Sequence, residues 1–115
     1  MRRLLASLVL VVCPATAFAT TITFDVPGSE APTQATAAYD CAGRKVSATY
    51  INAGANALAI LHLGGETVVT VNVLSGSGAR YAGQQYIWWT KGTEADLYDL
   101  TKGDDAAGVL CTPAG

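Results

Sequence analysis

The chain has 115 residues, of which 50% are hydrophobic and 14% are charged, and its formal net charge is −2 at pH 7. This length supports one domain with a thin hydrophobic core. The basic residues are few and scattered, which argues against a nucleic-acid partner, because phosphate binding needs a basic patch.

The first nineteen residues have the pattern of a secretory signal peptide. Arg2 and Arg3 precede an apolar run over residues 4–12, and small residues follow as far as Ala17-Phe18-Ala19. The apolar run is too short for a transmembrane span. We therefore expect cleavage after residue 19, a mature domain of residues 20–115, and a periplasmic location.

Cys13 lies within the predicted leader and raises the alternative of an outer-membrane lipoprotein. A lipidated cysteine follows a small residue, whereas Val12 precedes this one, so we favour a soluble periplasmic form. Removal of the leader takes away two of the seven basic residues and none of the nine acids, so the mature net charge becomes −4. A basic protein is a natural partner for such a domain.

The mature part of the sequence is typical of an all-β protein. Segments of four to eight residues rich in Val, Ile, Thr, Tyr and Trp recur between Gly, Asn and Asp, and we find no helical periodicity. Short antiparallel strands in a small exported domain favour a closed barrel of about eight strands, because closure leaves no open edge. The expected strands are 21–26, 37–41, 45–51, 57–63, 66–74, 85–90, 95–100 and 108–111.

Alternation along the strands predicts the buried faces. In the strand over 66–74, we expect the face that carries Val69, Val71 and Val73 to be buried, with Thr70 on the other face. The strand over 45–51 places Val46, Ala48 and Tyr50 together in the same way.

Two local features refine this picture. Gly64-Gly65 predicts a tight hairpin between the strands over 57–63 and 66–74, because paired glycines accept positive φ angles. Trp88 and Trp89 are adjacent on one strand and face opposite ways, so one belongs to the core and the other to a rim or an interface. The sequence does not decide which one is buried.

Cys41 and Cys111 are the cysteines that remain once the leader is removed. Disulfides persist in exported proteins, so we expect these two residues to pair. Closing a loop of about 70 residues removes unfolded-state entropy worth about 4 kcal/mol. The disulfide would therefore supply a large share of the stability of a domain of this size.

Two polar loops flank the aromatic strand, one over residues 77–81 with the pattern S-G-x-x-Y and one over 91–95 with the pattern K-G-x-x-A. Together with Tyr39-x-Cys41, the segment IWWTKG and the C-terminal cysteine, these motifs resemble the MliC/PliC family of membrane-bound or periplasmic inhibitors of c-type lysozyme, over about 37–111. The resemblance implies an eight-stranded antiparallel barrel whose two loops plug the lysozyme active-site cleft. The lysozyme-binding residues that it implies are Ser77, Gly78, Tyr81, Lys91, Gly92 and Ala95.

The chemistry of such a plug follows from its target. A lysozyme-type retaining glycosidase uses two carboxyl groups about 5 Å apart. The Lys91 ammonium can pair with the ionised carboxylate, and the Ser77 hydroxyl can donate to one carboxyl or accept from its protonated form, with Ser75 as a second candidate. Glycines beside them let the backbone turn tightly.

Other interpretations of the same residues stay open. Judged alone, Ser77 and Lys91 are ordinary turn residues, Arg80 is a structural ion-pair donor, and Tyr81 either packs under its loop or contacts the partner. The alternative function is a secreted β-barrel module that binds another protein or a glycan through the same loops. The sequence does not decide whether the domain forms a homodimer, or what residues 21–36 do.

The residues do not favour an enzyme. A Ser-His-Asp triad could use only His62, which lies in an apolar strand, and no nucleophile-elbow motif is present. A metal site needs more than one histidine once two cysteines are paired, and Asp104-Asp105 lacks the alternating acids of a calcium loop. We therefore expect no catalytic residues, no cofactor, no metal and no small-molecule substrate.

Overall fold

The computed structural model describes residues 9–12, 19–28 and 30–114. Cys13 and most of the predicted signal peptide lie outside these ranges. The described residues form eight strands and one 3-10 turn, and none of their helical segments is long and apolar enough to cross a membrane. The elements are β1 (Thr33–Cys41), β2 (Arg44–Ala53), β3 (Asn56–Leu63), β4 (Glu66–Val73), β5 (Ala79–Gly83), β6 (Tyr86–Lys91), β7 (Glu94–Asp99), η1 (Leu100–Lys102) and β8 (Val109–Pro113).

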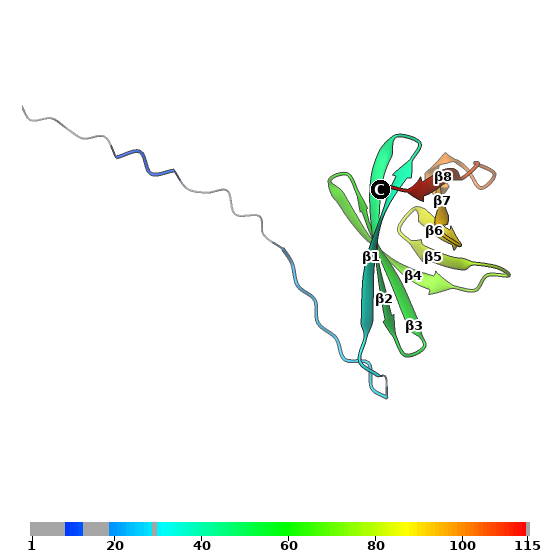
Figure 1. The fold of residues 1–115 in the computed structure, drawn as a ribbon, viewed down its shortest axis with the longest axis horizontal. Coiled ribbons are helices and arrows are strands. Elements are labelled where there is room, and N and C mark those ends of the chain that lie inside the picture. The colour runs from blue at the N-terminus through cyan, green and yellow to red at the C-terminus, as the bar shows by residue number, and fades with distance from the viewer. Residues whose placement is uncertain (1–8, 13–18, 29, 115) are drawn as a thin grey trace, which may run out of the picture.

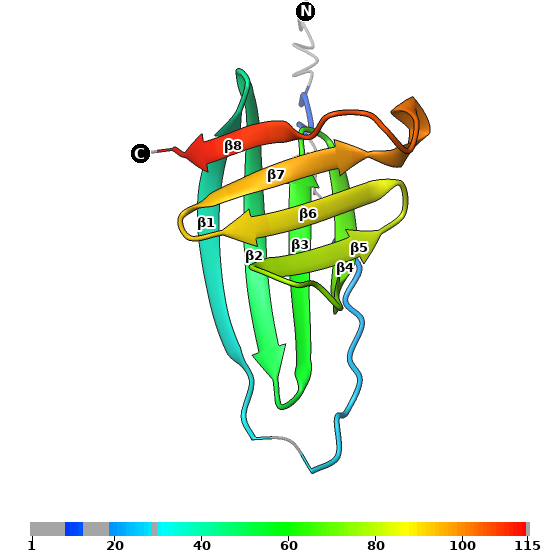
Figure 2. The same cartoon turned by 90° about the vertical axis from the view of Figure 1, so that its right-hand side faces the viewer.

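The eight strands form a closed antiparallel barrel in which each strand pairs with the next and β8 returns to β1 (Figure 1). Strands β1 to β4 are long and run side by side, and β5 to β8 cross them at a steep angle (Figure 2). The predicted fold class and strand number are confirmed. The crossing places the loop before β5 and the turn after β6 at one end of the β5–β7 sheet.

A disulfide joins the two strands that close the barrel. Cys41 on β1 and Cys111 on β8 are directly opposite in the strand register, and their side chains are bonded and buried. The predicted pairing is confirmed. The covalent link therefore lies at the point where the last strand meets the first.

The core contains a hydrogen-bonded aromatic cluster. Trp88 is fully buried, and its Nε1 donates to the Tyr50 hydroxyl at 2.9 Å. The Tyr50 and Tyr39 hydroxyls lie 2.8 Å apart, and the Tyr39 ring meets Trp88 edge-on. Burial, followed by the hydrogen bond with Tyr39, raises the pKa of Tyr50 well above its usual value. The buried indole N–H thus has its partner inside the barrel.

The predicted inner face of β4 is wrong. Val68 and Thr70 are fully buried, whereas Val69 and Val71 are 57% and 50% exposed. Directly opposite residues in an antiparallel pair share a face, and Thr70 lies opposite the buried Ala59. The Thr70 hydroxyl donates a hydrogen bond to the Ala59 carbonyl oxygen. The hydroxyl is satisfied locally, so the register with β3 decides the face rather than side-chain hydrophobicity.

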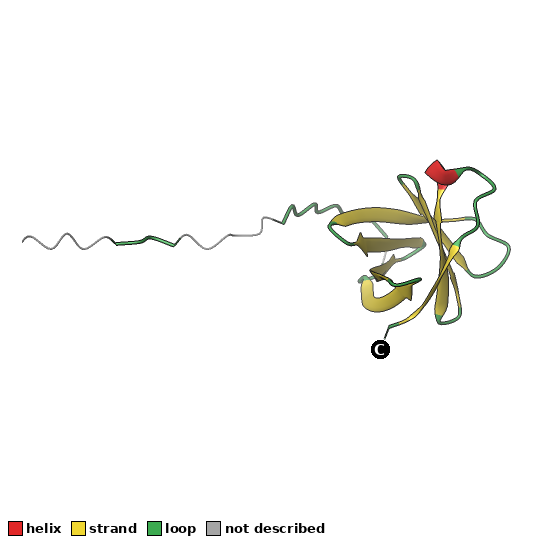
Figure 3. Ribbon diagram, turned by 90° about the horizontal axis from the view of Figure 1, so that it is seen from above, coloured by secondary structure: helices red, strands yellow, loops and turns green. Residues whose placement is uncertain are grey.

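Three further expectations differ from the structure. The segment over 21–26 pairs with no strand in the described part of the chain, because a strand needs a partner backbone that local alternation cannot supply. Residues 79–81, expected within a loop, belong to β5. The short 3-10 helix η1 was not expected (Figure 3). Asp99 caps it by accepting from the Thr101 backbone N–H at 3.0 Å, and the Thr101 hydrogen bonds lower the pKa of Asp99.

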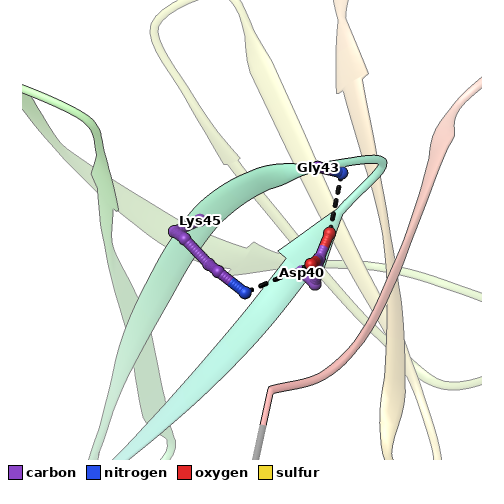
Figure 4. A network of polar contacts seen from close by, with 3 residues as sticks. All are labelled: Asp40, Gly43 and Lys45. Carbon is purple, nitrogen blue, oxygen red and sulfur yellow. Dashed lines mark hydrogen bonds and ion pairs between the residues drawn. The ribbon is translucent and has the colours of Figure 1, made fainter.

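The β1–β2 turn depends on one carboxylate. Ala42 and Gly43 both have positive φ angles, of 53° and 90°. The Asp40 side chain accepts from the Gly43 backbone N–H at 2.7 Å and from Lys45 Nζ at 3.2 Å (Figure 4). These contacts, the Gly43 hydrogen bond first, lower the pKa of Asp40. The carboxylate thereby offsets the strain of a non-glycine residue in the left-handed region.

Candidate functional site

The strand pairing brings the two polar loops of the sequence together. Ala79 at the start of β5 lies opposite Thr90 near the end of β6, and Thr90 in turn lies opposite Ala95 on β7. The loop over 74–78, between β4 and β5, and the β6–β7 turn therefore lie beside each other at one end of the sheet (Figure 2). This arrangement forms a single surface, which we call the tip surface and define by Ser77, Gly78, Lys91 and Gly92.

The four residues of the tip surface are exposed, whereas two other predicted contact residues are not. Tyr81 is 7% exposed and Ala95 is 2% exposed, and both belong to the core cluster. Tyr81 packs near Tyr50, with ring centroids 6.0 Å apart, and Ala95 lies opposite Cys111. Their side chains therefore support the loops from beneath, and their expected contact with a partner stays a prediction.

The Ser77 loop is held by hydrogen bonds at both of its ends. Ser75 Oγ donates to the Gly78 carbonyl at 3.2 Å, and Trp89 Nε1 donates to the Ser77 carbonyl at 2.9 Å. Ser75 therefore braces the loop, which gives it a role other than the second contact that we considered. The Ser77 hydroxyl has no hydrogen-bond partner among the described residues and can donate to a ligand.

Gly78 is required by both conformation and space. Its φ is +63°, in the left-handed region, and an added Cβ would lie 2.2 Å from the Thr90 carbonyl oxygen. The same Cβ would lie 3.2 Å from Trp89 Nε1 and from Lys91 Cγ. The loop thus lies flush against the end of β6.

Two cations contact the Trp89 ring from neighbouring positions. Lys91 Nζ lies 4.8 Å from the ring centroid and Arg80 Cζ lies 5.7 Å from it. Arg80 was expected to form an ion pair, but the structure places it over this ring, and the ion pair found within the described ranges joins Lys45 to Asp40. The tip surface therefore presents positive charge and one hydroxyl donor, which suits carboxylate ligands.

Trp89 is the residue of this site that sequence reasoning did not assign. The sequence left open which of two adjacent tryptophans is buried, and the structure places Trp88 inside and Trp89 outside. A cross-strand signal existed, because Arg80 and Trp89 lie directly opposite each other and Lys91 follows two positions later. It could be read only once the β5–β6 register was known.

The remaining candidates lie away from the tip surface. His62 is exposed on β3, and its Nδ1 lies 3.1 Å from the Thr67 hydroxyl. Over residues 9–12, 19–28 and 30–114, no three His, Cys, Asp or Glu side chains group in a way that could hold a metal ion. The chemistry available at the tip surface is therefore ionic and hydrogen-bonding recognition.

Comparisons with known proteins point to one family. The profile of the family described as membrane-bound lysozyme-inhibitor of c-type lysozyme matches residues 39–106, more than half of the chain. Proteins named membrane-bound lysozyme inhibitor of C-type lysozyme are 50% identical over 76 residues in Pseudomonas aeruginosa and 45% identical over 73 residues in Cupriavidus necator. These matches cover 64% and 63% of this chain, and the chain spans only 60% and 58% of the lengths of these relatives.

A solved structure agrees with these matches. The crystal structure of Pseudomonas aeruginosa MliC in complex with hen egg white lysozyme superposes with a TM-score of 0.71 at 39% sequence identity, covering 85% of this chain and 100% of the other. The chain therefore belongs to the family of membrane-bound lysozyme inhibitors of c-type lysozyme.

Proposed function

We propose that this protein inhibits c-type lysozyme by inserting its tip surface into the active-site cleft. The observation that carries the proposal is the juxtaposition of an exposed Lys91 ammonium and an exposed Ser77 loop at one end of the barrel. Membership of the family supports it, as does the likeness to a protein solved in complex with hen egg white lysozyme.

The mechanism is complementarity to two catalytic carboxyl groups. The Lys91 ammonium pairs with the ionised carboxylate, and the Ser77 hydroxyl hydrogen-bonds to the other carboxyl group. At an effective dielectric of 20, a pair of unit charges 4 Å apart gains roughly 4 kcal/mol before desolvation is subtracted. A neutral hydrogen bond contributes only about 1 kcal/mol, so Lys91 is the dominant contact.

The shape of the tip surface suits a narrow cleft. Gly78 and Gly92 have positive φ angles and no side chain, so the two loops present little bulk beside the hydroxyl and the ammonium. The barrel behind them is closed by strand pairing and by the Cys41–Cys111 disulfide. Inhibition then consists of steric exclusion of the glycan by a rigid plug, with no bond made or broken, and the protein is not an enzyme.

We place the protein in the cell envelope, as a soluble periplasmic form. Both named relatives are called membrane-bound, which agrees with a location in the envelope. The leader and the Val12-Cys13 context favour cleavage after residue 19 over lipidation. Metabolic labelling with a fatty acid, comparing the natural chain with Cys13→Ser, tests this choice. Label that depends on Cys13 would establish the lipoprotein form.

Lysis of Micrococcus cell walls by hen egg white lysozyme, followed by turbidity, tests the proposed function. The protein purified after export should abolish clearing at micromolar concentration, and heat-denatured protein with its disulfide reduced should not. Full lysozyme activity at micromolar protein would reject the proposal. The tip surface would then serve another protein or a glycan, and binding of c-type lysozyme should be absent in calorimetry as well.

A further inference from the structure

Trp89 contacts both halves of the tip surface. Its indole N–H donates to the Ser77 carbonyl at 2.9 Å, and its ring centroid lies 4.8 Å from Lys91 Nζ. Its backbone belongs to β6, which is paired on both sides, with Arg80 opposite on β5 and Asp96 opposite on β7. The indole thus extends from a strand that is paired on both sides to a loop that belongs to no strand.

The two contacts restrain different degrees of freedom. A hydrogen bond to the Ser77 carbonyl restrains that peptide unit and, through it, the direction of the Ser77 side chain. The ring contact restrains the four-carbon stem of Lys91, a side chain that otherwise loses much rotamer entropy when it is ordered. Binding is tighter when this ordering has already taken place in the free protein.

The packing of the loop against β6 supports the same role. Gly78 approaches so closely that an added Cβ would lie 3.2 Å from Trp89 Nε1, which leaves the loop little room to move toward the sheet. The Ser75 hydroxyl closes the loop on its other side by donating to the Gly78 carbonyl. Trp89 therefore completes a set of contacts that holds the loop from the side of the strand.

We propose that Trp89 is a positioning residue that pre-organises both parts of the tip surface, its N–H holding the Ser77 loop and its ring holding the Lys91 ammonium. This inference rests on the proposed function, because it explains how the hydroxyl and the ammonium reach the cleft together. It assigns the effect of Trp89 to the conformation of the free protein rather than to a contact with the partner.

Two substitutions separate the two contacts. Trp89→Phe keeps an aromatic ring for Lys91 and removes the N–H, whereas Trp89→Leu removes both. Val69→Thr, on the exposed face of β4, is the matched control. Near-ultraviolet circular dichroism of the buried Trp88 and the melting temperature verify that each variant is folded.

Nuclear magnetic resonance of the free protein gives a readout independent of lysozyme. In the natural protein, ring currents should shift the Lys91 ε-methylene protons upfield relative to those of Lys45, which pairs with Asp40. Amide order parameters at Ser77 and Gly78 should be near those of the strands, about 0.85. Trp89→Phe should lower these order parameters and keep the Lys91 shift, and Trp89→Leu should abolish both.

Dissociation rates from hen egg white lysozyme give the second readout. We expect Trp89→Phe to raise the dissociation rate about threefold to tenfold, the range of one lost hydrogen bond, and Trp89→Leu to raise it more than about tenfold. Unchanged loop order parameters and an unchanged dissociation rate in a folded Trp89→Leu variant would overturn the inference. Should that variant fail to fold, Trp89→Phe decides in the same way.

The two proposals fail separately. If the natural protein does not bind lysozyme, the proposed function is rejected, and the resonance measurements alone decide whether Trp89 orders the loop and the lysine. If the natural protein binds but the Trp89 variants bind equally well with ordered loops, the proposed function stands and the positioning role is rejected.

Discussion

The two sides of β6 use the same type of residue for different purposes. Trp88 faces inward, is fully buried, and donates its N–H to the Tyr50 hydroxyl at 2.9 Å. Trp89 faces outward, is partly exposed, and donates its N–H to the Ser77 carbonyl at the same distance. The Trp88 hydrogen bond satisfies a buried polar group in the core, and the Trp89 hydrogen bond holds a surface loop against β6.

This difference divides the molecule into a stability region and a recognition region. Over the described ranges, every buried side-chain nitrogen and oxygen has a hydrogen-bond partner, so the interior leaves no buried polar side-chain atom unpaired. The tip surface, by contrast, keeps an ammonium and a hydroxyl available to a ligand. Substitutions inside should therefore lower the free energy of unfolding, and substitutions of Ser77 or Lys91 at the tip surface should lower affinity alone.

The largest expected effect is on the interior side of β6. Trp88→Ala should lower the free energy of unfolding by about 3 to 5 kcal/mol, because it leaves a large cavity in a close-packed barrel. Guanidinium unfolding followed by circular dichroism measures this change. The affinity of the fraction that remains folded should stay within about threefold of the natural protein. A decrease in the free energy of unfolding of less than about 1 kcal/mol would contradict the assignment of Trp88 to the stability region.

The second prediction concerns the disulfide that joins β1 to β8, where the barrel closes. Replacing Cys41 and Cys111 together by Ala should lower the free energy of unfolding by about 4 kcal/mol, because a loop with a sequence separation of 70 is no longer closed in the unfolded chain. Thermal unfolding of the double variant, with the natural protein under oxidising and reducing conditions as the comparison, gives the measurement. An unchanged melting temperature would show that strand pairing alone closes the barrel.

The largest expected effect at the tip surface comes from its ammonium. Lys91→Ala should weaken binding of c-type lysozyme by about 2 to 5 kcal/mol, because a catalytic carboxylate loses its partner. Titration calorimetry measures this loss, and Lys102→Ala on η1 is the matched control for a change of net charge. The melting temperature should be unchanged, since Lys91 is exposed. If the two variants bound lysozyme with equal affinity, the proposed pairing of Lys91 with a catalytic carboxylate would be rejected.

Tyr50 sharpens the comparison because it is the acceptor for Trp88. Tyr50→Phe leaves the buried indole N–H without a partner and should lower the free energy of unfolding by about 1 to 3 kcal/mol. Chemical unfolding at neutral pH measures this change, and Thr49→Ala on the same strand is the control. A variant as stable as the natural protein would show that the Trp88–Tyr50 hydrogen bond contributes little.

The same substitution carries a prediction about pH. Burial raises the pKa of Tyr50 in the folded state above the unfolded value of 10.0, so its contribution to stability is fully present below that value and is lost as pH rises beyond it. The natural protein should lose stability steadily above pH 10, and Tyr50→Phe should lose less over the same interval. Parallel curves for both proteins would assign the alkaline loss to other groups.

The smallest expected effect belongs to the hydroxyl of the tip surface. Ser77→Ala should weaken lysozyme binding by about 1 kcal/mol, because it removes one neutral hydrogen bond and leaves the Ser77 carbonyl bonded to Trp89. Calorimetry alongside Ser47→Ala, on β2, gives the measurement. A loss as large as that of Lys91→Ala would mean that the hydroxyl meets a charged group.

Much of the fold could be predicted from local patterns. Alternation gave the inward row of Val46, Ala48 and Tyr50 on β2, and Gly64-Gly65 correctly marked the β3–β4 hairpin, with Gly64 at a φ of 65°. Of the six predicted contact residues, four lie on the exposed tip surface. Tyr81 and Ala95 are buried instead, because each lies on a strand whose inner face packs in the barrel core.

What the sequence by itself determined is seven of the eight strands, the Gly64-Gly65 hairpin turn and the pairing of Cys41 with Cys111, because side-chain periodicity and glycine placement act locally and the chain offers few cysteines to pair. Only the tertiary structure decided which face of β4 is buried, which tryptophan faces outward and where Arg80 goes. These outcomes depend on the register between paired strands. A shift of that register by one residue moves every side chain of the strand to the opposite face of the sheet. The contacts of Trp89 with both loops exist only in that register.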